Sequence, residues 1–350
     1  MIIQKSDFIS IIKPLKAAIS SKLTGNTEGV LVKDNHIIAD NHAYTIAAEF
    51  KCPEKPFVLP KRAIELIESL PEGEIKIEPS EKDVVIKSKA GNGRFSTVSA
   101  DAFYISNQLA ASDATACSFS ASTLCDLLSR VIYACAHDNS VHSGVLIESD
   151  GESLYLAAMD GYRLAIAHTK QKSPFRVIIP ATTAAKLISL GITGNISICA
   201  TKNAINIKTD SYTISTKQLK GNFVDYRAAV PKAHTAILEI DRAELTDVIS
   251  RSLICSYNGT EKAPIALEYS GGILKIRSIS TVAVYEAELD ALLIDGPDGY
   301  IKIGLNGKFL LDALKTYAED KVQLEYNGTL KPIVVKGAML TSIVMPVKIK

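Results

Sequence analysis

The segment FVLPKRAIELIESL at residues 57–70 has two counterparts further along the chain, VIIPATTAAKLISL at 177–190 and IGLNGKFLLDALKTY at 303–317. Each is a short β-rich run, followed by a stop at Pro60, Pro180 or Asn306 and then by a short helix with an apolar stripe. The three stops lie 120 and 126 residues apart. The chain therefore contains a repeat with a period of about 120 residues.

A second set of helical segments supports the same period. Apolar residues at i, i+3, i+4 and i+7 begin at Phe8, Leu124 and Leu245, which predicts a helix with one buried stripe in each repeat. Candidate capping residues precede these helices: Ser6, Ser120 or Ser122, and Asp241. Two independent landmarks thus agree on the repeat.

Strand-like runs fill the rest of each repeat, for example at 74–88, 195–209 and 321–337. The order helix, strands, helix, strands predicts an α+β domain in which two helices pack on β-sheet. We expect three such domains, at residues 1–113, 114–236 and 237–350. Because no Gly/Ser-rich linker separates them, the domains are expected to abut.

Composition excludes several classes of protein. The 350 residues are 47% hydrophobic and 22% charged, which is ordinary for a soluble globular protein. The net charge of +1 argues against a uniformly basic coat, although 39 basic and 38 acidic side chains can still be distributed unevenly between faces. Six cysteines form no CxxC pair, and we expect free, buried thiols. With no signal peptide or membrane-spanning run, a cytoplasmic location is expected, with no membrane partner.

Three motifs resemble those of one family. MDGYRLA at 159–165 resembles the DGxRLA hairpin of bacterial DNA polymerase III beta subunits, the beta sliding clamps. GNFVDYR at 221–227 resembles the FPDYR segment of that family, and IVMPVK at 343–348 resembles its terminal strand. Their order and spacing also match, and with the threefold repeat the resemblance covers the whole chain.

The resemblance implies a non-enzymatic processivity factor. Three clamp domains would form half of a six-domain ring, and a homodimer would encircle double-stranded DNA with its helices lining the hole and its sheets outside. The implied partners are a DNA polymerase, a clamp loader and other proteins that carry a clamp-binding peptide motif.

The resemblance also implies an apolar cleft for a short peptide that carries Gln and hydrophobic residues. The expected cleft residues come from the hairpin, the interdomain segment, the third repeat and the terminal strand: Gly161, Tyr162, Arg163, Leu164, Val224, Asn306, Phe309, Leu330, Pro332, Met345, Pro346, Val347 and Lys348. A lining of Met and aliphatic side chains suits many related peptides, because it repacks readily. Arg163 could instead form a salt bridge that holds the hairpin.

Basic residues lie away from the apolar stripes of the first helices: Lys13, Lys16, Arg130 and Arg251. In a ring they would attract DNA phosphates through water, without contacting bases. Solvated helix faces explain the same residues equally well.

Ring closure requires the end of one subunit to meet the start of the other. We expect a basic strand region in the first repeat to pair with an acidic strand in the third: Lys87, Lys89 and Arg94, with Glu286, Glu288 and Asp290. The apolar part of this contact is expected at Phe103, Ile254 and Cys255. Alternatively, these charges only keep edge strands soluble.

Four positions depart from the family pattern. Met159 stands where Thr is common, Tyr162 where His is common, Ala228 where a basic residue is frequent, and His142 where the cleft is usually apolar. The preferred peptide, the polymerase and the loader are therefore left open.

An enzyme is disfavoured. The six His form no HExxH or HxH motif, and GxSxG, GxxxxGKS/T and GxGxxG are absent. His137, Asp138 and Ser143 are too close in sequence for a credible triad. We expect no catalytic residue, metal or cofactor.

Two further hypotheses stay open: a clamp-like scaffold that is not loaded on DNA, and a clamp that serves a plasmid, phage or reduced genome with altered partners.

Overall fold

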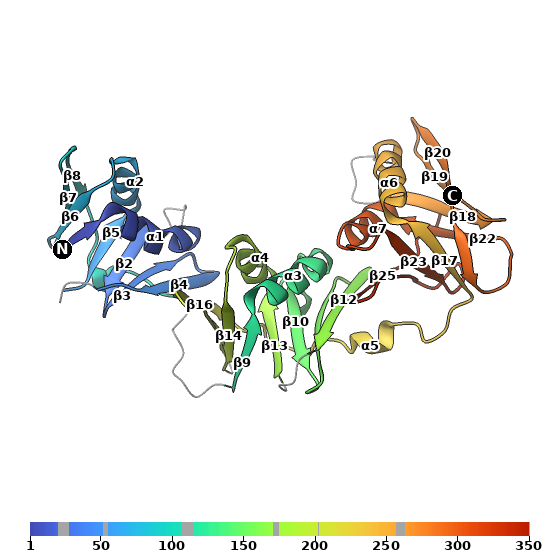
Figure 1. Ribbon diagram of the computed structural model, residues 1–350, viewed down its shortest axis with the longest axis horizontal. Helices are drawn as coiled ribbons and strands as arrows, with labels where there is room; N and C mark the ends of the chain where they lie inside the picture. The colour runs from blue at the N-terminus through green and yellow to red at the C-terminus, as the bar shows by residue number, and fades with distance from the viewer. Residues whose placement is uncertain are drawn as a thin grey trace. The chain divides into compact units, whose positions relative to one another are not determined.

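The computed structural model describes residues 1–19, 28–51, 55–106, 115–170, 175–201, 203–256 and 263–349. The fold mixes helices with antiparallel sheets (Figure 1), which confirms the α+β class expected from the sequence. The chain divides into two units. Unit 1 comprises Met1–Leu124 and Ala185–Leu219, and unit 2 comprises Cys125–Ala184 and Lys220–Lys350.

Unit 1 contains a small and a large antiparallel sheet. The small sheet has the order β1-β6-β7-β8: β1 (Ile2–Gln4), β6 (Glu74–Pro79), β7 (Asp83–Ser88) and β8 (Gly91–Ser96). The large sheet has the order β5-β2-β3-β4-β16-β15-β14-β9: β5 (Phe57–Pro60), β2 (Gly29–Lys33), β3 (His36–Asp40), β4 (Tyr44–Glu49), β16 (Tyr212–Lys217), β15 (Ala204–Lys208), β14 (Asn195–Ala200) and β9 (Thr115–Ser120).

The helices of unit 1 pack against both of its sheets. They are α1 (Lys5–Leu15), η1 (Lys16–Ala18), α2 (Lys61–Ser69) and η2 (Ala100–Ala102). Helix α2 contacts β7 and β8 of the small sheet and β2 and β5 of the large sheet. The predicted stripe of α1 is confirmed, because Phe8, Ile12 and Leu15 are fully buried.

Unit 2 repeats this arrangement of two sheets. Its large sheet has the order β13-β10-β11-β12-β25-β24-β23-β17-β21: β13 (Phe175–Pro180), β10 (Gly144–Ser149), β11 (Ser153–Met159), β12 (Arg163–Lys170), β25 (Leu340–Val344), β24 (Ile333–Lys336), β23 (Lys321–Tyr326), β17 (Ala236–Asp241) and β21 (Leu292–Asp295). Its small sheet has the order β20-β19-β18-β22: β20 (Val284–Asp290), β19 (Ile273–Ile279), β18 (Pro264–Ser270) and β22 (Ile301–Asn306).

The helices of unit 2 also contact both sheets. They are η3 (Ile132–Ala134), η4 (Val141–Ser143), α5 (Tyr226–Ala229), α6 (Arg242–Ser256) and α7 (Gly307–Leu314). Helix α6 lies beside α7 and contacts β18, β19 and β20 as well as β17 and β23 (Figure 1). The division into units falls within α3 (Ala121–Val131) and α4 (Ala181–Ser189). Within the described ranges, no helix is both long enough and apolar enough to cross a membrane.

Each large sheet joins strands of two successive sequence repeats. In unit 1, β4 of the first repeat pairs with β16 of the second, and in unit 2, β12 of the second pairs with β25 of the third. Backbone hydrogen bonds therefore run across both junctions, which fits the lack of linkers in the sequence. The domain boundaries near residues 113 and 236 remain predictions.

The repeat extends to individual hydrogen bonds in three hairpin turns, at residues 41–44, 160–163 and 280–283. The first residue of each turn is Asn41, Asp160 or Ser280, and its side-chain oxygen accepts from the backbone N–H groups two and three residues later. Its own N–H donates to the carbonyl of the fourth residue. Short polar side chains favour such turns because they mimic a backbone turn.

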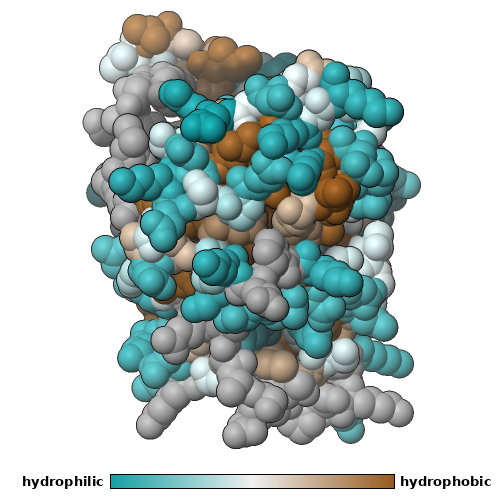
Figure 2. Space-filling view, turned by 90° about the vertical axis from the view of Figure 1, so that its left-hand side faces the viewer, coloured by the Kyte–Doolittle hydropathy of each residue, from teal (hydrophilic) through white to brown (hydrophobic). Residues whose placement is uncertain are grey.

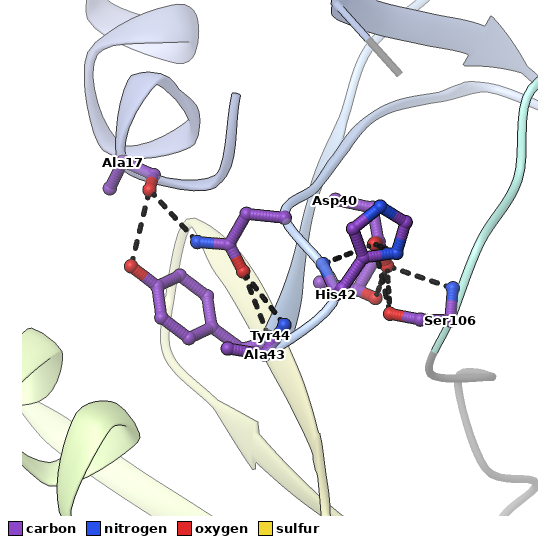
Figure 3. A network of polar contacts seen from close by, with 8 residues as sticks. Ala17, Asp40, His42, Ala43, Tyr44 and Ser106 are labelled. Carbon is purple, nitrogen blue, oxygen red and sulfur yellow. Dashed lines mark hydrogen bonds and ion pairs between the residues drawn. The ribbon is translucent and has the colours of Figure 1, made fainter. Parts of the chain in front are cut away.

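Figure 3 shows the first of these turns and the buried carboxylate beside it. Asp40 is 0% exposed and accepts hydrogen bonds from the backbone N–H of His42 and Ser106 and from the hydroxyls of Thr45 and Ser106. The hydroxyl of Tyr44 donates to Ala17 O at 3.1 Å. This network holds the hairpin against η1 and against the segment that follows η2.

The cysteines of the described part of the chain are outside disulfides, as the sequence predicts, but only two of them are fully buried. Cys117 and Cys135 are buried, and Cys125, Cys199 and Cys255 are partly buried. Cys52 lies outside the described residues.

Candidate partner-binding site

The turn at residues 160–163 joins β11 to β12 and presents one aromatic side chain to solvent. Asp160 Oδ1 accepts from the backbone N–H groups of Tyr162 and Arg163 at 2.9 and 3.0 Å. Gly161 has φ +86°, a left-handed conformation that residues with a Cβ rarely adopt. Tyr162, which follows this turn, is 66% exposed.

Arg163 fastens this turn to α7. Its Nε donates to Asp160 Oδ2 at 2.9 Å and its NH1 to Asp312 Oδ2 at 2.7 Å. The guanidinium lies 4.5 Å from the ring centroid of Phe309 and 5.4 Å from that of Tyr133. Because the side chain is only 7% exposed, the geometry favours the salt-bridge role over direct peptide contact.

Strand register places three of the predicted residues side by side at one end of the large sheet. On adjacent strands β12, β25 and β24, Arg163 pairs with Val344 and Val344 pairs with Ile333. The next residues outward are therefore Tyr162, Met345 and Pro332, and the N–H of Met345 donates to Tyr162 O at 2.9 Å. Phe309 adds its ring from α7, 6.4 Å from the ring of Tyr162.

The C-terminal segment then passes from the large sheet to the small one. Pro346 forms a bridge with Leu305 of β22, and the N–H of Val347 donates to Gly304 O at 2.8 Å. Asn306 follows on β22 and caps α7, with its Oδ1 accepting from Lys308 N at 3.1 Å. Residues 345–348 thus lie between the two sheets of unit 2.

The segment after β16 is fastened by the motif residues Tyr226 and Arg227. The Tyr226 hydroxyl donates to Glu148 Oε1 at 2.8 Å, and the guanidinium groups of Arg227 and Arg176 pair with the same carboxylate. The guanidinium of Arg227 also lies 4.9 Å from the ring centroid of Tyr155. Burial and the hydrogen bond to Glu148 raise the pKa of Tyr226 above its usual range.

This anchor follows Phe223 and Val224 in the chain, with Asp225 between them and Tyr226. Phe223 is 6% exposed and packs edge-on against His142, with 5.1 Å between ring centroids. Val224 is 49% exposed. The segment therefore buries one apolar side chain and presents the next to solvent.

The predicted cleft residues range from exposed to buried, and Phe309, Pro332, Pro346 and Val347 are half-buried. Four apolar side chains are well exposed: Tyr162 (66%), Val224 (49%), Leu330 (89%) and Met345 (40%). Leu164 (3%), Arg163 (8%) and Asn306 (6%) are buried, so they position the site and offer little surface to a ligand. The sequence predicted all of them as one contact set because the motif gives no measure of burial.

A buried polar network lies beneath the hairpin. The hydroxyls of Tyr133 and Tyr317 both lie within hydrogen-bond distance of Ser342 Oγ, at 3.0 and 3.1 Å. Burial raises the pKa of both tyrosines above the usual range and raises the pKa of the Cys135 thiol to about 12. These groups therefore remain neutral at physiological pH.

The sequence alone did not reveal the partners that hold the motifs in place, Asp312, Tyr133 and Glu148. Asp160 was identified only as part of its motif, although its counterparts Asn41 and Ser280 occupy the same place in the repeat. That spacing could have identified it as the residue that shapes the turn.

The four basic residues expected to face DNA differ in their surroundings. Lys13 is exposed near the end of α1. Lys16 pairs with Glu68 at 2.7 Å and Arg130 with Asp126 at 2.9 Å, whereas Arg251 Nε donates to the hydroxyl of Tyr285 at 3.0 Å. Lys16 and Arg130 are therefore partly neutralised by neighbouring carboxylates.

The strands expected to close a ring lie at sheet edges. Strand β8, which carries Arg94, is at the edge of the small sheet of unit 1, and β20, which carries Glu286, Glu288 and Asp290, is at the edge of the small sheet of unit 2. Ile254 is 78% exposed on α6, and Cys255 beside it is partly buried.

Other residues of that set have local roles. Lys87 lies on the inner strand β7 and pairs with Glu78 at 2.7 Å, and Lys89 lies in the turn that follows. Glu286 pairs with Lys275 and Arg277 on β19. Phe103 is 6% exposed in a core cluster with Leu31, Ile38, Ala47 and Val58, so it offers little surface, and its place in the subunit contact stays a prediction.

Each of the two edge strands adjoins a cavity, and the side chains that line the two cavities are mainly of opposite charge. Beside β8, a cavity of about 610 Å³ is lined by Lys61, Arg62 and Arg94 together with Phe95 and one acidic residue, Glu28. Beside β20, a cavity of about 470 Å³ has four acidic side chains and one basic one in its lining: Glu244, Asp247, Glu288, Asp290 and Arg251. Figure 2, which views the side where β6, β7 and β8 lie, shows apolar patches among hydrophilic side chains.

Within the described residues, no three His, Cys, Asp or Glu side chains gather in a group that could hold a metal ion.

Comparison with known proteins gives consistent matches. The family model of the DNA polymerase III beta subunit central domain matches residues 119–225, and that of the C-terminal domain matches residues 227–348. The beta sliding clamp of Staphylococcus aureus is 25% identical over 304 residues, 83% of this chain and 79% of that protein. The beta sliding clamp of Pseudomonas putida is 29% identical over 278 residues, 75% of this chain and 73% of that protein.

Solved structures share the fold. A ligand-bound DNA polymerase sliding clamp from Pseudomonas aeruginosa has a TM-score of 0.90 at 23% identity, covering 100% of this chain and 99% of that one. A sliding clamp from Bartonella birtlesii bound to griselimycin has a TM-score of 0.89 at 20% identity, with the same coverage. The two family models match successive parts of the chain in the order of its repeats, and the chain belongs to the DNA polymerase III beta subunit family, the beta sliding clamps.

Proposed function

We propose that this protein is a non-catalytic DNA sliding clamp, a ring-shaped homodimer that encircles duplex DNA and tethers a polymerase and other DNA-processing proteins. The observation that carries the tethering role is the apolar surface at the end of strands β12, β25 and β24. Tyr162 and Met345 are exposed there in adjacent register, with Phe309 packed beside them. We call this surface, with Val224, Leu330 and Pro332, the hairpin site.

The hairpin site has the features of a peptide-binding surface. Its side chains are apolar and four of them are well exposed, whereas the residues beneath them are held by buried ion pairs and hydrogen bonds. A rigid platform with exposed Met and aromatic side chains gains free energy when a partner covers it, and it loses little conformational entropy. Met also adapts to ligands of slightly different shape.

The test measures binding of a fluorescein-labelled peptide, Gln-Leu-Ser-Leu-Phe, by anisotropy. Deletion of residues 345–350 and the separate substitution Tyr162→Ala should each weaken binding at least about tenfold, because each removes exposed apolar contact area. The matched control is Tyr300→Ala, which removes a tyrosine of similar exposure, 64%, outside the site. Unchanged affinity in both site variants would remove the assignment.

Opposite charges at the two edge strands support a closed ring. Basic side chains surround the β8 edge and acidic side chains surround the β20 edge. Because a strand edge with unpaired backbone groups readily pairs with another edge, head-to-tail pairing of β8 with β20 is favoured, and pairing of like edges is discouraged. Two such contacts related by a twofold axis would complete a homodimeric ring.

The role on DNA is tested by topology. Protein loaded on a nicked circular duplex should remain bound in moderate salt, and linearisation of the same duplex should release it, because a ring is retained by linkage rather than by contacts. Equal loss from circle and line would indicate ordinary surface binding. Peptide binding without retention on circles would favour the clamp-like scaffold.

A further inference from the structure

His142 has a buried ring nitrogen without a partner. Its Nε2 is shielded from solvent and makes no hydrogen bond within the described part of the chain. The backbone of the same residue is firmly held, because its N–H donates to Ser140 Oγ at 3.2 Å and its carbonyl accepts from Ala136 N at 2.9 Å. The ring packs edge-on against Phe223.

These contacts place His142 next to the hairpin site. Phe223 is followed directly by Val224, one of the exposed residues of that site. On the other side, Ala136 follows Cys135, and Cys135 lies close enough to Arg163 and Asp160 for their charges to act on the pKa of its thiol. The imidazole therefore packs on the segment that presents Val224, and its backbone is hydrogen-bonded to the residue that follows Cys135.

An unpaired polar atom in such a place is costly to the free protein. Burial removes the water that would otherwise bind Nε2, and the described surroundings supply no replacement. The residue as a whole is only partly buried, so rotation of the ring can carry this nitrogen to the surface, where a bound partner with a hydrogen-bonding group recovers the lost interaction. A purely apolar side chain at the same place leaves Nε2 unpaired in the complex as well.

We propose that His142 is a specificity-determining residue of the hairpin site, which selects a partner peptide whose side chain beside Phe223 carries a hydroxyl or carboxamide that pairs with Nε2. This inference rests on the peptide-binding function proposed above. A neutral imidazole either donates or accepts at Nε2, according to its tautomer. Hydroxyl and carboxamide groups can both donate and accept, so they match either tautomer.

The test compares labelled Gln-Leu-Ser-Leu-Phe with analogues in which Phe becomes Tyr or one Leu at a time becomes Gln. At least one polar analogue should bind the wild-type protein about fivefold or more tightly than the parent peptide, a difference of about 1 kcal/mol. In His142→Leu, which keeps an apolar side chain of similar size without the nitrogen, the parent peptide should bind more tightly than that analogue.

The matched control is His168→Leu. His168 also packs against an aromatic ring, with 6.0 Å between its centroid and that of Tyr155, but it lies near the far end of β12 from the hairpin. This variant should rank the peptides as the wild type does. A direct readout is the ¹⁵N resonance of His142 Nε2, which should move when the preferred polar analogue binds and not when the parent peptide binds.

The outcomes separate the two proposals. If no peptide of the panel binds the wild-type protein, the hairpin site itself is wrong. If the parent peptide binds, but the wild type and His142→Leu rank the panel identically, the site stands and the role of His142 is overturned. A Nε2 resonance that no analogue moves overturns it in the wild-type protein alone, whatever the stability of the variant.

Discussion

At the scale of single residues, Arg163 connects the hairpin, α7 and the aromatic side chains between them. Its two carboxylate partners come from its own turn and from α7, 149 residues further along the chain. Two nearly buried ion pairs fix the backbone from which Tyr162 projects. Arg163 therefore acts on the hairpin site by positioning it.

Replacing Arg163 with Met should lower the free energy of unfolding by about 2–4 kcal/mol, since it leaves Asp160 and Asp312 without their cation in a partly buried setting. Urea unfolding measures this change. Arg176→Met is the control, because that guanidinium is 57% exposed and Glu148 keeps Arg227 and Tyr226. Its expected cost is below about 1 kcal/mol. Similar losses in both variants would contradict the structural role.

The residues of the site could be predicted only as far as their type and spacing allow. The DGxRLA motif identified the turn, because Asp and Gly at those positions favour one backbone conformation. It did not identify Asp312, which reaches Arg163 only after the chain has folded. Sequence motifs also carry no information about burial. Leu164 and Asn306 were therefore grouped with the exposed residues.

At the scale of elements, the N-termini of two helices show when a capping side chain in the sequence determines where a helix begins and when it does not. Asp241 was predicted to cap α6, and Glu244 N donates to Asp241 Oδ1 at 2.9 Å. Ser6 was predicted to cap α1, which was wrong, because α1 begins at Lys5 and no side chain caps it. There the backbone N–H of Lys5 donates to Gly73 O at 2.9 Å, so a tertiary contact replaces the cap.

This difference predicts different costs for two similar substitutions. Asp241→Ala should lower the free energy of unfolding by about 1 kcal/mol, because one N–H at the start of α6 loses its acceptor. Ser6→Ala should change it by less than about 0.5 kcal/mol. Denaturant titrations of both variants measure these values. A larger effect at Ser6 would restore it as the cap.

The C-terminal segment depends on the absence of a side chain on β22. A Cβ added at Gly304 would lie 2.4 Å from Val347 O and 2.6 Å from Ile349 Cγ2. Gly304→Ala should therefore displace residues 346–349 from β22 while both sheets stay folded. Hydrogen exchange at the Val347 amide should become at least about tenfold faster, and peptide binding at the hairpin site should weaken.

Gly299→Ala is the control for this substitution, because the nearest atom to an added Cβ is 3.9 Å away. It should leave both the exchange rate and the peptide affinity unchanged. Unaltered exchange at Val347 in Gly304→Ala would mean that the segment tolerates the side chain by a small shift.

At the scale of the whole molecule, the repeat in the sequence predicted the helices and most of the strands. It did not predict that strands of successive repeats share a sheet, as β4 does with β16 and β12 with β25. Apolar alternation defines which residues face a core, whereas the choice of neighbouring strand depends on edges that meet only in three dimensions. The same limit applies to the contact between subunits, which remains a proposal.

The proposed ring can be tested by exchanging charges between its two edges. Arg94→Glu and Glu288→Arg should each place like charges opposite one another, lower the affinity of the dimer at least about tenfold and give monomers at low micromolar concentration. The double variant restores opposite charges in reversed order and should recover the dimer. Sedimentation velocity over a range of protein concentrations measures the change, and Glu152→Arg, an exposed reversal in the turn between β10 and β11, is the control. Because each residue acts twice in a symmetric ring, the effect of a single reversal is doubled, and its rescue requires both edges to be in contact. If the single variants dimerise as the wild type does, β8 and β20 do not meet, and the ring must close elsewhere.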